Sequence, residues 1–173
     1  MTLPSRTSSS TLSVLTQSLD GYRGYEDVQQ RERSDSELRR QLTSRIASLL
    51  KGLAVGPNAA QPKDQERLDE LFKSSRRKLL TITESLNSPT YKGVPFFVKD
   101  NQSPKQLARI YKFEETMLSE LGSLAEEVSA VNQDILERDV FEDHFLHIQD
   151  FIDSFNQALF EREALILGNE GMI

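Results

Sequence analysis

Residues 107–135, LARIYKFEETMLSELGSLAEEVSAVNQDI, carry the most regular pattern in the chain. Apolar side chains return every seven residues at two positions of the repeat. They are Ile110, Met117, Leu124 and Val131 at one position, and Leu107, Leu121, Val128 and Ile135 at the other. Glu114 interrupts the second series. Because a period of 3.5 residues keeps one edge of a helix against a partner, the stretch predicts a long helix within a helical bundle.

The flanking residues indicate where this helix and the next one begin and end. Residues 103–106, SPKQ, have the form of a capping box with proline at the first helical position. The helix is predicted to run on to about Glu137, which makes it roughly 50 Å long. Asp139 is predicted to cap a last helix that ends near Gly168. The short turn between the two helices predicts that they pack antiparallel. The last helix carries an apolar stripe of Phe141, Phe145, Ile148, Ile152, Phe155 and Leu159.

Two further helices are predicted upstream, over residues 26–53 and from Pro62 to Asn87. The second half of the first has an apolar face: Leu38, Leu42, Ile46, Leu49, Leu50 and Leu53. Its first half, residues 29–37, contains no apolar side chain. A helix that is polar all round cannot be held by apolar packing. This half is therefore predicted to project from the bundle, supported by charge pairs, or to fray.

The N-terminal region precedes the predicted bundle domain of residues 26–173. Residues 1–10 form a Ser/Thr-rich tail that is predicted to be disordered. Residues 11–25 are predicted to form a short amphipathic helix followed by a Gly-Tyr linker. Tyr22 and Tyr25 in this linker have two interpretations: a hydrophobic latch onto the bundle, or a motif that binds a partner.

A long connection over residues 88–102 joins the second and third helices of the predicted bundle. It is longer than most connections in a compact domain and contains Phe96 and Phe97. These aromatic side chains are interpreted as a plug at one end of the bundle, as an exposed hook for a partner, or as part of a short edge strand.

The sequence thus predicts an all-α fold, an antiparallel four-helix bundle with long helices. A short N-terminal helix and the long aromatic loop between helices 2 and 3 complete it. An up-down-up-down order is favoured because consecutive elements usually pack together. The length of the second connection leaves a crossover topology open.

Composition excludes several classes of function. The chain has 173 residues, no cysteine, and a formal net charge of −6. Without cysteine it has no disulfide, thiolate metal site or cysteine nucleophile. An acidic chain is a poor match for nonspecific nucleic-acid binding. No apolar run approaches the ~20 residues of a membrane helix. With no secretory leader apparent in residues 1–10, a cytoplasmic location is expected.

Two polar residues are candidates for special positions. Glu114 either reaches water where the apolar seam opens, or forms an interhelical pair with an arginine such as Arg76 or Arg45, or acts as a catalytic acid. His144 is interpreted as a boundary histidine at the edge of the core. His147, with Asp143 and Asp150 at helical spacing, could form a metal-binding edge, but it falls on the outer face, so no metal site is predicted.

These observations favour a non-enzymatic protein-protein interaction protein, a scaffold or adaptor that acts through helix surfaces and could form homo-oligomers. No cofactor and no catalytic residue is expected. An alternative is a ligand- or metal-binding bundle, in which Glu114 or His144 is the polar anchor and the ligand lies among Phe141, Phe145, Ile148 and Phe155 of the last helix. A third hypothesis is peripheral membrane contact through Leu12, Leu15 and Leu19 or through the Phe96-Phe97 loop.

Overall fold

The computed structural model describes residues 6–53, 58–88, 93–133 and 135–168, and this part of the chain is helical without a named strand. The helices are α1 (Arg6–Ser18), α2 (Val28–Gly52), a 3-10 turn η1 (Pro62–Asp64), α3 (Gln65–Asn87), α4 (Pro95–Val98), α5 (Pro104–Val131) and α6 (Arg138–Leu167). The predicted all-α class is confirmed. Helix α1 begins at Arg6, so the prediction of a disordered tail is wrong for residues 6–10; residues 1–5 lie outside the described part.

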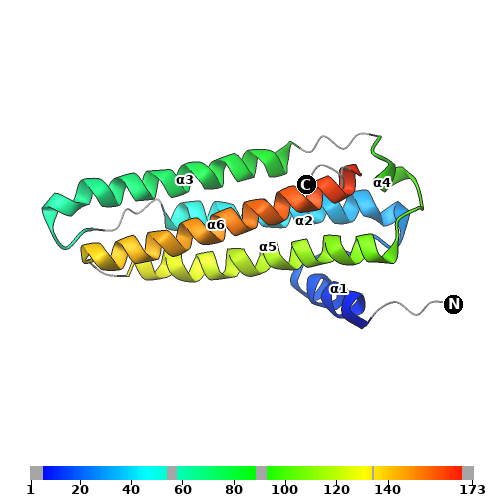
Figure 1. Cartoon of the computed structure of the whole chain (residues 1–173), viewed down its shortest axis with the longest axis horizontal. Coiled ribbons are helices and arrows are strands. Elements are labelled where there is room, and N and C mark those ends of the chain that lie inside the picture. The colour runs from blue at the N-terminus through cyan, green and yellow to red at the C-terminus, as the bar shows by residue number, and fades with distance from the viewer. Residues whose placement is uncertain (1–5, 54–57, 89–92, 134, 169–173) are drawn as a thin grey trace.

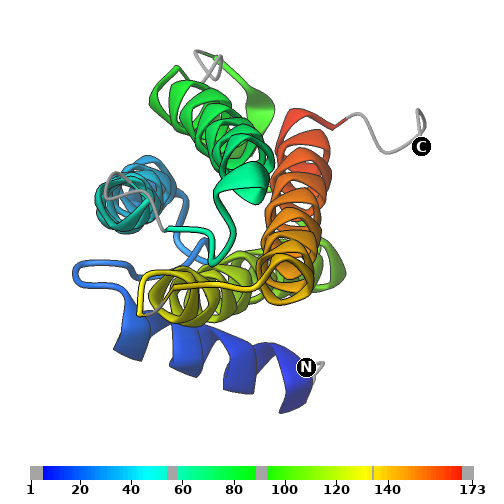
Figure 2. The same cartoon turned by 90° about the vertical axis from the view of Figure 1, so that its left-hand side faces the viewer.

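Four long helices surround one apolar core (Figures 1 and 2). Seen end-on in Figure 2, α2 and α6 each lie between α3 and α5, which occupy opposite corners. Figure 1 shows that α2 and α5 run in one direction and that α3 and α6 run in the other. Neighbours α2 and α5 are therefore parallel, as are α3 and α6. Consecutive helices alternate in direction, but α3 and α5 lie at opposite corners. The favoured order, in which consecutive helices pack side by side, is therefore wrong at this step, and the crossover topology that the long second connection left open is the one observed.

The heptad pattern of α5 is buried as predicted, with an exception at its C-terminal end. Ser103 Oγ accepts a hydrogen bond from Gln106 N at 3.1 Å, which confirms the predicted cap. The helix ends at Val131, earlier than expected, and Ile135 beyond it is 70 % exposed. The chain leaves the helix there because Leu136 pairs with the segment before η1, donating from its N to Asn58 O at 2.9 Å.

Helix α6 begins at Arg138, and Asp139 lies in its first turn instead of capping it. Its predicted end is confirmed: Gly168 adopts a φ of 76°, a left-handed conformation that glycine accepts without steric cost. Within the bundle α6 packs extensively along α5.

The polar first half of α2 does not project from the bundle. Asp27 caps the helix by accepting from Gln29 N at 2.9 Å. Arg31, Ser34 and Asp35 are all buried within this half. The prediction that it projects or frays is therefore wrong, because Arg162 of α6 pairs with Asp35 and backbone carbonyls of the linker and the α4 segment accept from Arg31.

The connection between α3 and α5 contains the short helix α4, whose Phe96 and Phe97 side chains are buried. The ring of Phe96 meets that of Tyr25 edge-on, with centroids 5.4 Å apart. Arg31 fastens the segment by donating from Nη1 to Phe96 O at 2.8 Å and to Lys99 O at 2.9 Å. The aromatic pair closes this end of the bundle, and the hook and edge-strand interpretations are wrong.

Candidate functional site

A cluster of polar side chains lies inside the bundle. We call it the polar core cluster: Tyr22, Tyr25, Asp35, Glu114 and Arg162. Arg162 on α6 donates from Nε to Glu114 Oε1 at 2.7 Å and from Nη2 to Asp35 Oδ1 at 2.5 Å. Tyr25 OH donates to Glu114 Oε1 at 2.7 Å, and Tyr22 OH donates to Glu114 Oε2. The cluster thus joins the Gly-Tyr linker, α2, α5 and α6.

The electrostatics of the cluster are set by burial. Glu114 and Arg162 are both 0 % exposed. Burial raises the pKa of Glu114 above its ordinary value, although Arg162 and the hydrogen bonds from Tyr22 and Tyr25 act in the opposite direction. Burial also raises the pKa of both tyrosines, so their hydroxyls remain protonated donors. Asp35 receives a second cation, since Arg39 Nε donates to its Oδ2 at 3.0 Å.

The prediction that Glu114 reaches water is therefore wrong. It pairs with an arginine, but not with either suggested one: Arg76 donates to Leu50 O at 2.8 Å, and Arg45 donates to Ser18 O at 3.1 Å. The true partner, Arg162, was missed although the sequence held a signal. It follows Phe155 and Leu159 at helical spacing, so it extends the apolar stripe of α6 with a charge opposite to that of Glu114.

The four aromatic residues predicted as partner-binding candidates are all internal. Tyr22 and Tyr25 bond Glu114, while Phe96 and Phe97 close the end of the bundle. None of the four offers its side chain to a partner in this structure. Of the two interpretations of Tyr22 and Tyr25, the latch onto the bundle agrees with where they lie: both side chains are buried and both hydroxyls bond Glu114. Chemically, the polar core cluster can hold four segments in register, and among the described residues its central carboxylate, Glu114, is fully covered by protein.

A second polar group lies at the surface between α5 and α6. His144 Nδ1 is 2.6 Å from Glu127 Oε2, and His147 Nδ1 is 3.3 Å from Glu127 Oε1. The side chain of His144 is 27 % exposed, which is the position of a boundary residue. Sequence reasoning missed Glu127 because it lies on the other helix. No group of three or more potential ligands among the described residues is arranged to hold a metal ion.

The ligand hypothesis placed aromatic residues and a polar anchor together. The structure buries Phe141, Phe145 and Phe155 in the core and puts Glu114 and His144 in two separate polar groups.

Leu15 and Leu19, proposed as membrane contacts, are also buried against the bundle. Across the described residues, each helix is too short or too polar to span a bilayer.

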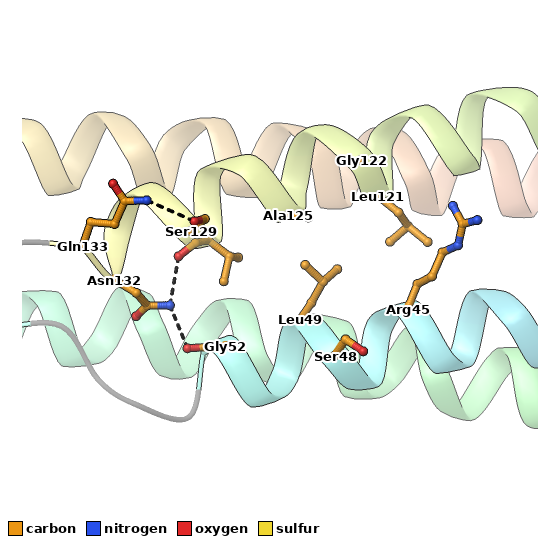
Figure 3. Close-up of a pocket in the computed structure, with 11 residues that line it drawn as sticks. Arg45, Ser48, Leu49, Gly52, Leu121, Gly122, Ala125, Ser129, Asn132 and Gln133 are labelled. Atoms are coloured by element: carbon orange, nitrogen blue, oxygen red, sulfur yellow. Dashed lines mark hydrogen bonds between the residues drawn. The ribbon is translucent and has the colours of Figure 1, made fainter. Parts of the chain in front are cut away.

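A groove runs between the parallel helices α2 and α5 (Figure 3). Its volume is about 610 Å³. It is lined by Arg45, Ser48, Leu49 and Gly52 of α2, by Leu121, Gly122, Ala125, Val128 and Ser129 of α5, and by Asn132 and Gln133 just after α5. Figure 3 shows Arg45 at one end and Asn132 with Gln133 at the other. Asn132 Nδ2 bridges the two helices by donating to Gly52 O at 2.8 Å.

Small side chains make the groove wide. Gly122, Ala125 and Ser129 are all exposed along α5, whereas Leu49 and Leu121 point toward one another across the gap (Figure 3). A Cβ added at Gly122 would meet no atom within 4 Å. The groove therefore presents an open surface with an apolar floor and a single charged lining residue, Arg45.

Comparisons with protein-family models, with curated proteins and with solved structures found no match to this chain. Its function is therefore inferred from the polar core cluster, the surface histidines and the groove.

Proposed function

We propose that this chain is a non-enzymatic interaction protein, a scaffold or adaptor that binds a partner protein through the surfaces of its long helices. The observation that carries the proposal is the open groove between α2 and α5, with its small and apolar lining. Grooves between helices commonly take an amphipathic helix from a partner. Self-association through such helix surfaces and a cytoplasmic location belong to the same proposal, in keeping with the acidic, cysteine-free composition.

The placement of the polar groups supports this proposal over an enzymatic one. Glu114, the candidate acid, is bonded to Arg162 and two tyrosines and is sealed from solvent. Glu127 and its two histidines lie at the surface, away from the groove residues. A catalytic site needs reactive groups that converge where a substrate can lie. The groove instead offers area and shape, which are what a protein partner requires.

Site-specific photocrosslinking in the native host tests the proposal. A photoreactive phenylalanine derivative replaces Ser129, which is exposed in the groove, or Asp150, which is exposed on α6. We expect a discrete covalent adduct from position 129 and none from position 150. Adding Gly122→Trp to the first variant fills the groove and should remove the adduct.

The oligomeric state supplies the second measurement. Light scattering coupled to size exclusion reports whether the chain associates with itself, and a crosslinked dimer would identify a second copy as the partner. A chain that stays monomeric and yields no adduct from position 129 would contradict the proposed function.

A further inference from the structure

One face of α5 runs the length of the helix but is covered over part of it. Seven residues spaced by three or four mark this face, the last of them at the position that follows the helix. They are Tyr111, Glu114, Leu118, Gly122, Ala125, Ser129 and Asn132. The first three are buried, and the last four are exposed. The open part of this face is the α5 side of the groove.

The covered part is occupied by the N-terminal segment of the chain itself. Helix α1 packs against α5, and Figure 2 shows it lying across the outer side of α5. It presents Leu12 and Leu15, and Leu19 follows directly after the helix at the same spacing of three and four residues. The linker then places the Tyr22 and Tyr25 hydroxyls on Glu114. An amphipathic helix is thus the element that this face of α5 already accepts.

The groove begins where α1 ends. Arg45, at one end of the groove, donates from Nη2 to Ser18 O at 3.1 Å, at the last residue of α1. On the α5 side the lining begins at Leu121 and continues to the helix end at Val131, roughly 15 Å of helix or just under three turns, and Asn132 and Gln133 follow directly. The open surface is therefore continuous with the α1 interface and long enough for a second short helix.

The α5 side chains on the two parts of this face differ in size. The part covered by α1 and the linker has tyrosine, glutamate and leucine, whereas the open part has glycine, alanine and serine. Space remains above these small residues, since a Cβ at Gly122 would meet no atom within 4 Å. An occupant must therefore supply the large apolar side chains that fill the groove. The charge of Arg45 at one end favours an acidic residue on that occupant.

We propose that the groove binds an amphipathic α-helix of a partner protein, with large apolar residues spaced by three and four and an acidic residue placed beside Arg45. This inference rests on the proposed function and specifies the chemistry of the partner. A second copy of the chain is the competing occupant, because Phe160 and Leu167 are exposed on one side of α6.

Selection from a displayed library of helical peptides tests the inference with the full chain. Peptides are selected on the wild type alone, and their affinities are then measured on Gly122→Trp, with Gly122→Ala as the matched control that leaves the groove open. We expect the enriched peptides to carry apolar residues at the 3-4 spacing. Their affinity should fall at least about tenfold on Gly122→Trp and stay within about twofold on Gly122→Ala.

Charge reversal tests the orientation of the bound helix. Arg45→Glu should weaken peptides that carry an acidic residue at the Arg45 end, and replacing that residue by lysine should restore binding. Ala125→Glu is a second variant that blocks the groove from an exposed position, for use if Gly122→Trp does not fold. Circular dichroism establishes folding before each measurement.

Two outcomes would overturn the inference. Enriched peptides without the apolar spacing, or with binding unchanged by both groove-blocking variants, would show that the groove is not a helix site. A dimer seen by light scattering and lost in Gly122→Trp would identify a second copy as the occupant; the inference then fails while the proposed function stands. Absence of both peptides and photocrosslinked adducts would remove the proposed function itself.

Discussion

Each half of α5 carries a glutamate that faces α6, and the two glutamates differ in burial and in the partners that they bond. Glu114 in the first half is sealed in the core and bonded to Arg162, Tyr22 and Tyr25. Glu127 in the second half remains partly exposed and lies beside His144 and His147. Near Glu114 the helices are joined by charges and hydrogen bonds; near Glu127 the core is apolar and an open groove lies alongside. The specific ion pairs and hydrogen bonds therefore lie along the first half of α5, and the surface open to a partner lies along its second half.

This difference indicates a division of roles along the bundle. A buried ionic cluster adds little net stability over well-packed apolar residues, but breaking one pair in it is costly. Its hydrogen bonds require particular partners, so it favours one register of the four segments that it joins. The apolar end needs no such specific pairing, which leaves the outer faces of α2 and α5 free to bind another helix.

Removal of Arg162 should have the largest effect on stability. Arg162→Met keeps the length of the side chain but leaves Glu114 and Asp35 without their shared cation. We expect the free energy of unfolding to fall by about 3–5 kcal/mol. Urea titration monitored by circular dichroism measures the change. Arg138→Met, at a half-exposed surface position with ion pairs to Glu142 and Asp64, is the matched control and should cost less than about 1 kcal/mol.

Loss of a tyrosine hydroxyl should have the next largest effect, and the two tyrosines should differ. Tyr25 OH donates to Glu114 and accepts from Arg162 Nη2 at 2.7 Å, whereas Tyr22 OH bonds to Glu114. Tyr25→Phe therefore disturbs two buried partners and should cost about 2–3 kcal/mol, against about 1–2 kcal/mol for Tyr22→Phe. The same urea titration ranks them, and equal or reversed costs would contradict the assigned hydrogen bonds.

The buried carboxyl should also leave a signature in the pH dependence of stability. Since burial raises the pKa of Glu114, the folded chain holds this proton at pH values where the unfolded chain has lost it. The free energy of unfolding of the wild type should therefore fall, relative to that of Glu114→Gln, as pH rises from about 4 toward the raised pKa. Urea titrations at a series of pH values measure this difference. A difference that grows with pH would mean that Arg162 and the tyrosines outweigh burial.

The two glycines of the groove should respond differently to alanine, one with a gain in stability and the other without. Gly122 lies in an exposed turn of α5 with open space above it, so Gly122→Ala should stabilise the chain by about 1 kcal/mol. A Cβ at Gly52 would come within 2.9 Å of Val128 Cγ1, so Gly52→Ala should lose that gain to the clash. Thermal unfolding compares the two variants. A stabilising Gly52→Ala would show that α2 and α5 can separate at this end without cost.

Much of the fold could be predicted from the sequence because it depends on local patterns. The apolar heptads of α5, the cap at Ser103 and the glycine that ends α6 are each legible in a single segment. The buried first half of α2 was not, since arginine and aspartate are normally surface residues, and Arg31 and Asp35 become internal through partners far away in the chain, Phe96 O and Arg162. The crossed packing order likewise depends on contacts between distant elements.

The candidate sites divide in the same way. Glu114 was recognisable because it breaks an apolar series, and Arg162 could have been found by the same test on α6. Their pairing required the relative placement of two helices. The groove depends on the separation between α2 and α5, which the sequence pattern does not specify. The small residues at 122, 125 and 129 indicate only that this face of α5 has little side-chain bulk.

The surface glutamate provides the smallest expected effect and the sharpest contrast with Glu114. Glu127→Gln removes the negative charge beside His144 and His147 but leaves an amide that can still form hydrogen bonds. Because these groups are partly exposed to solvent, we expect a loss of less than about 1 kcal/mol at neutral pH. Urea titration of Glu127→Gln beside Glu114→Gln makes the comparison within one helix. If the two substitutions cost the same, burial would not be what distinguishes the halves of α5, and the division between a pairing end and a binding end would lose its physical basis.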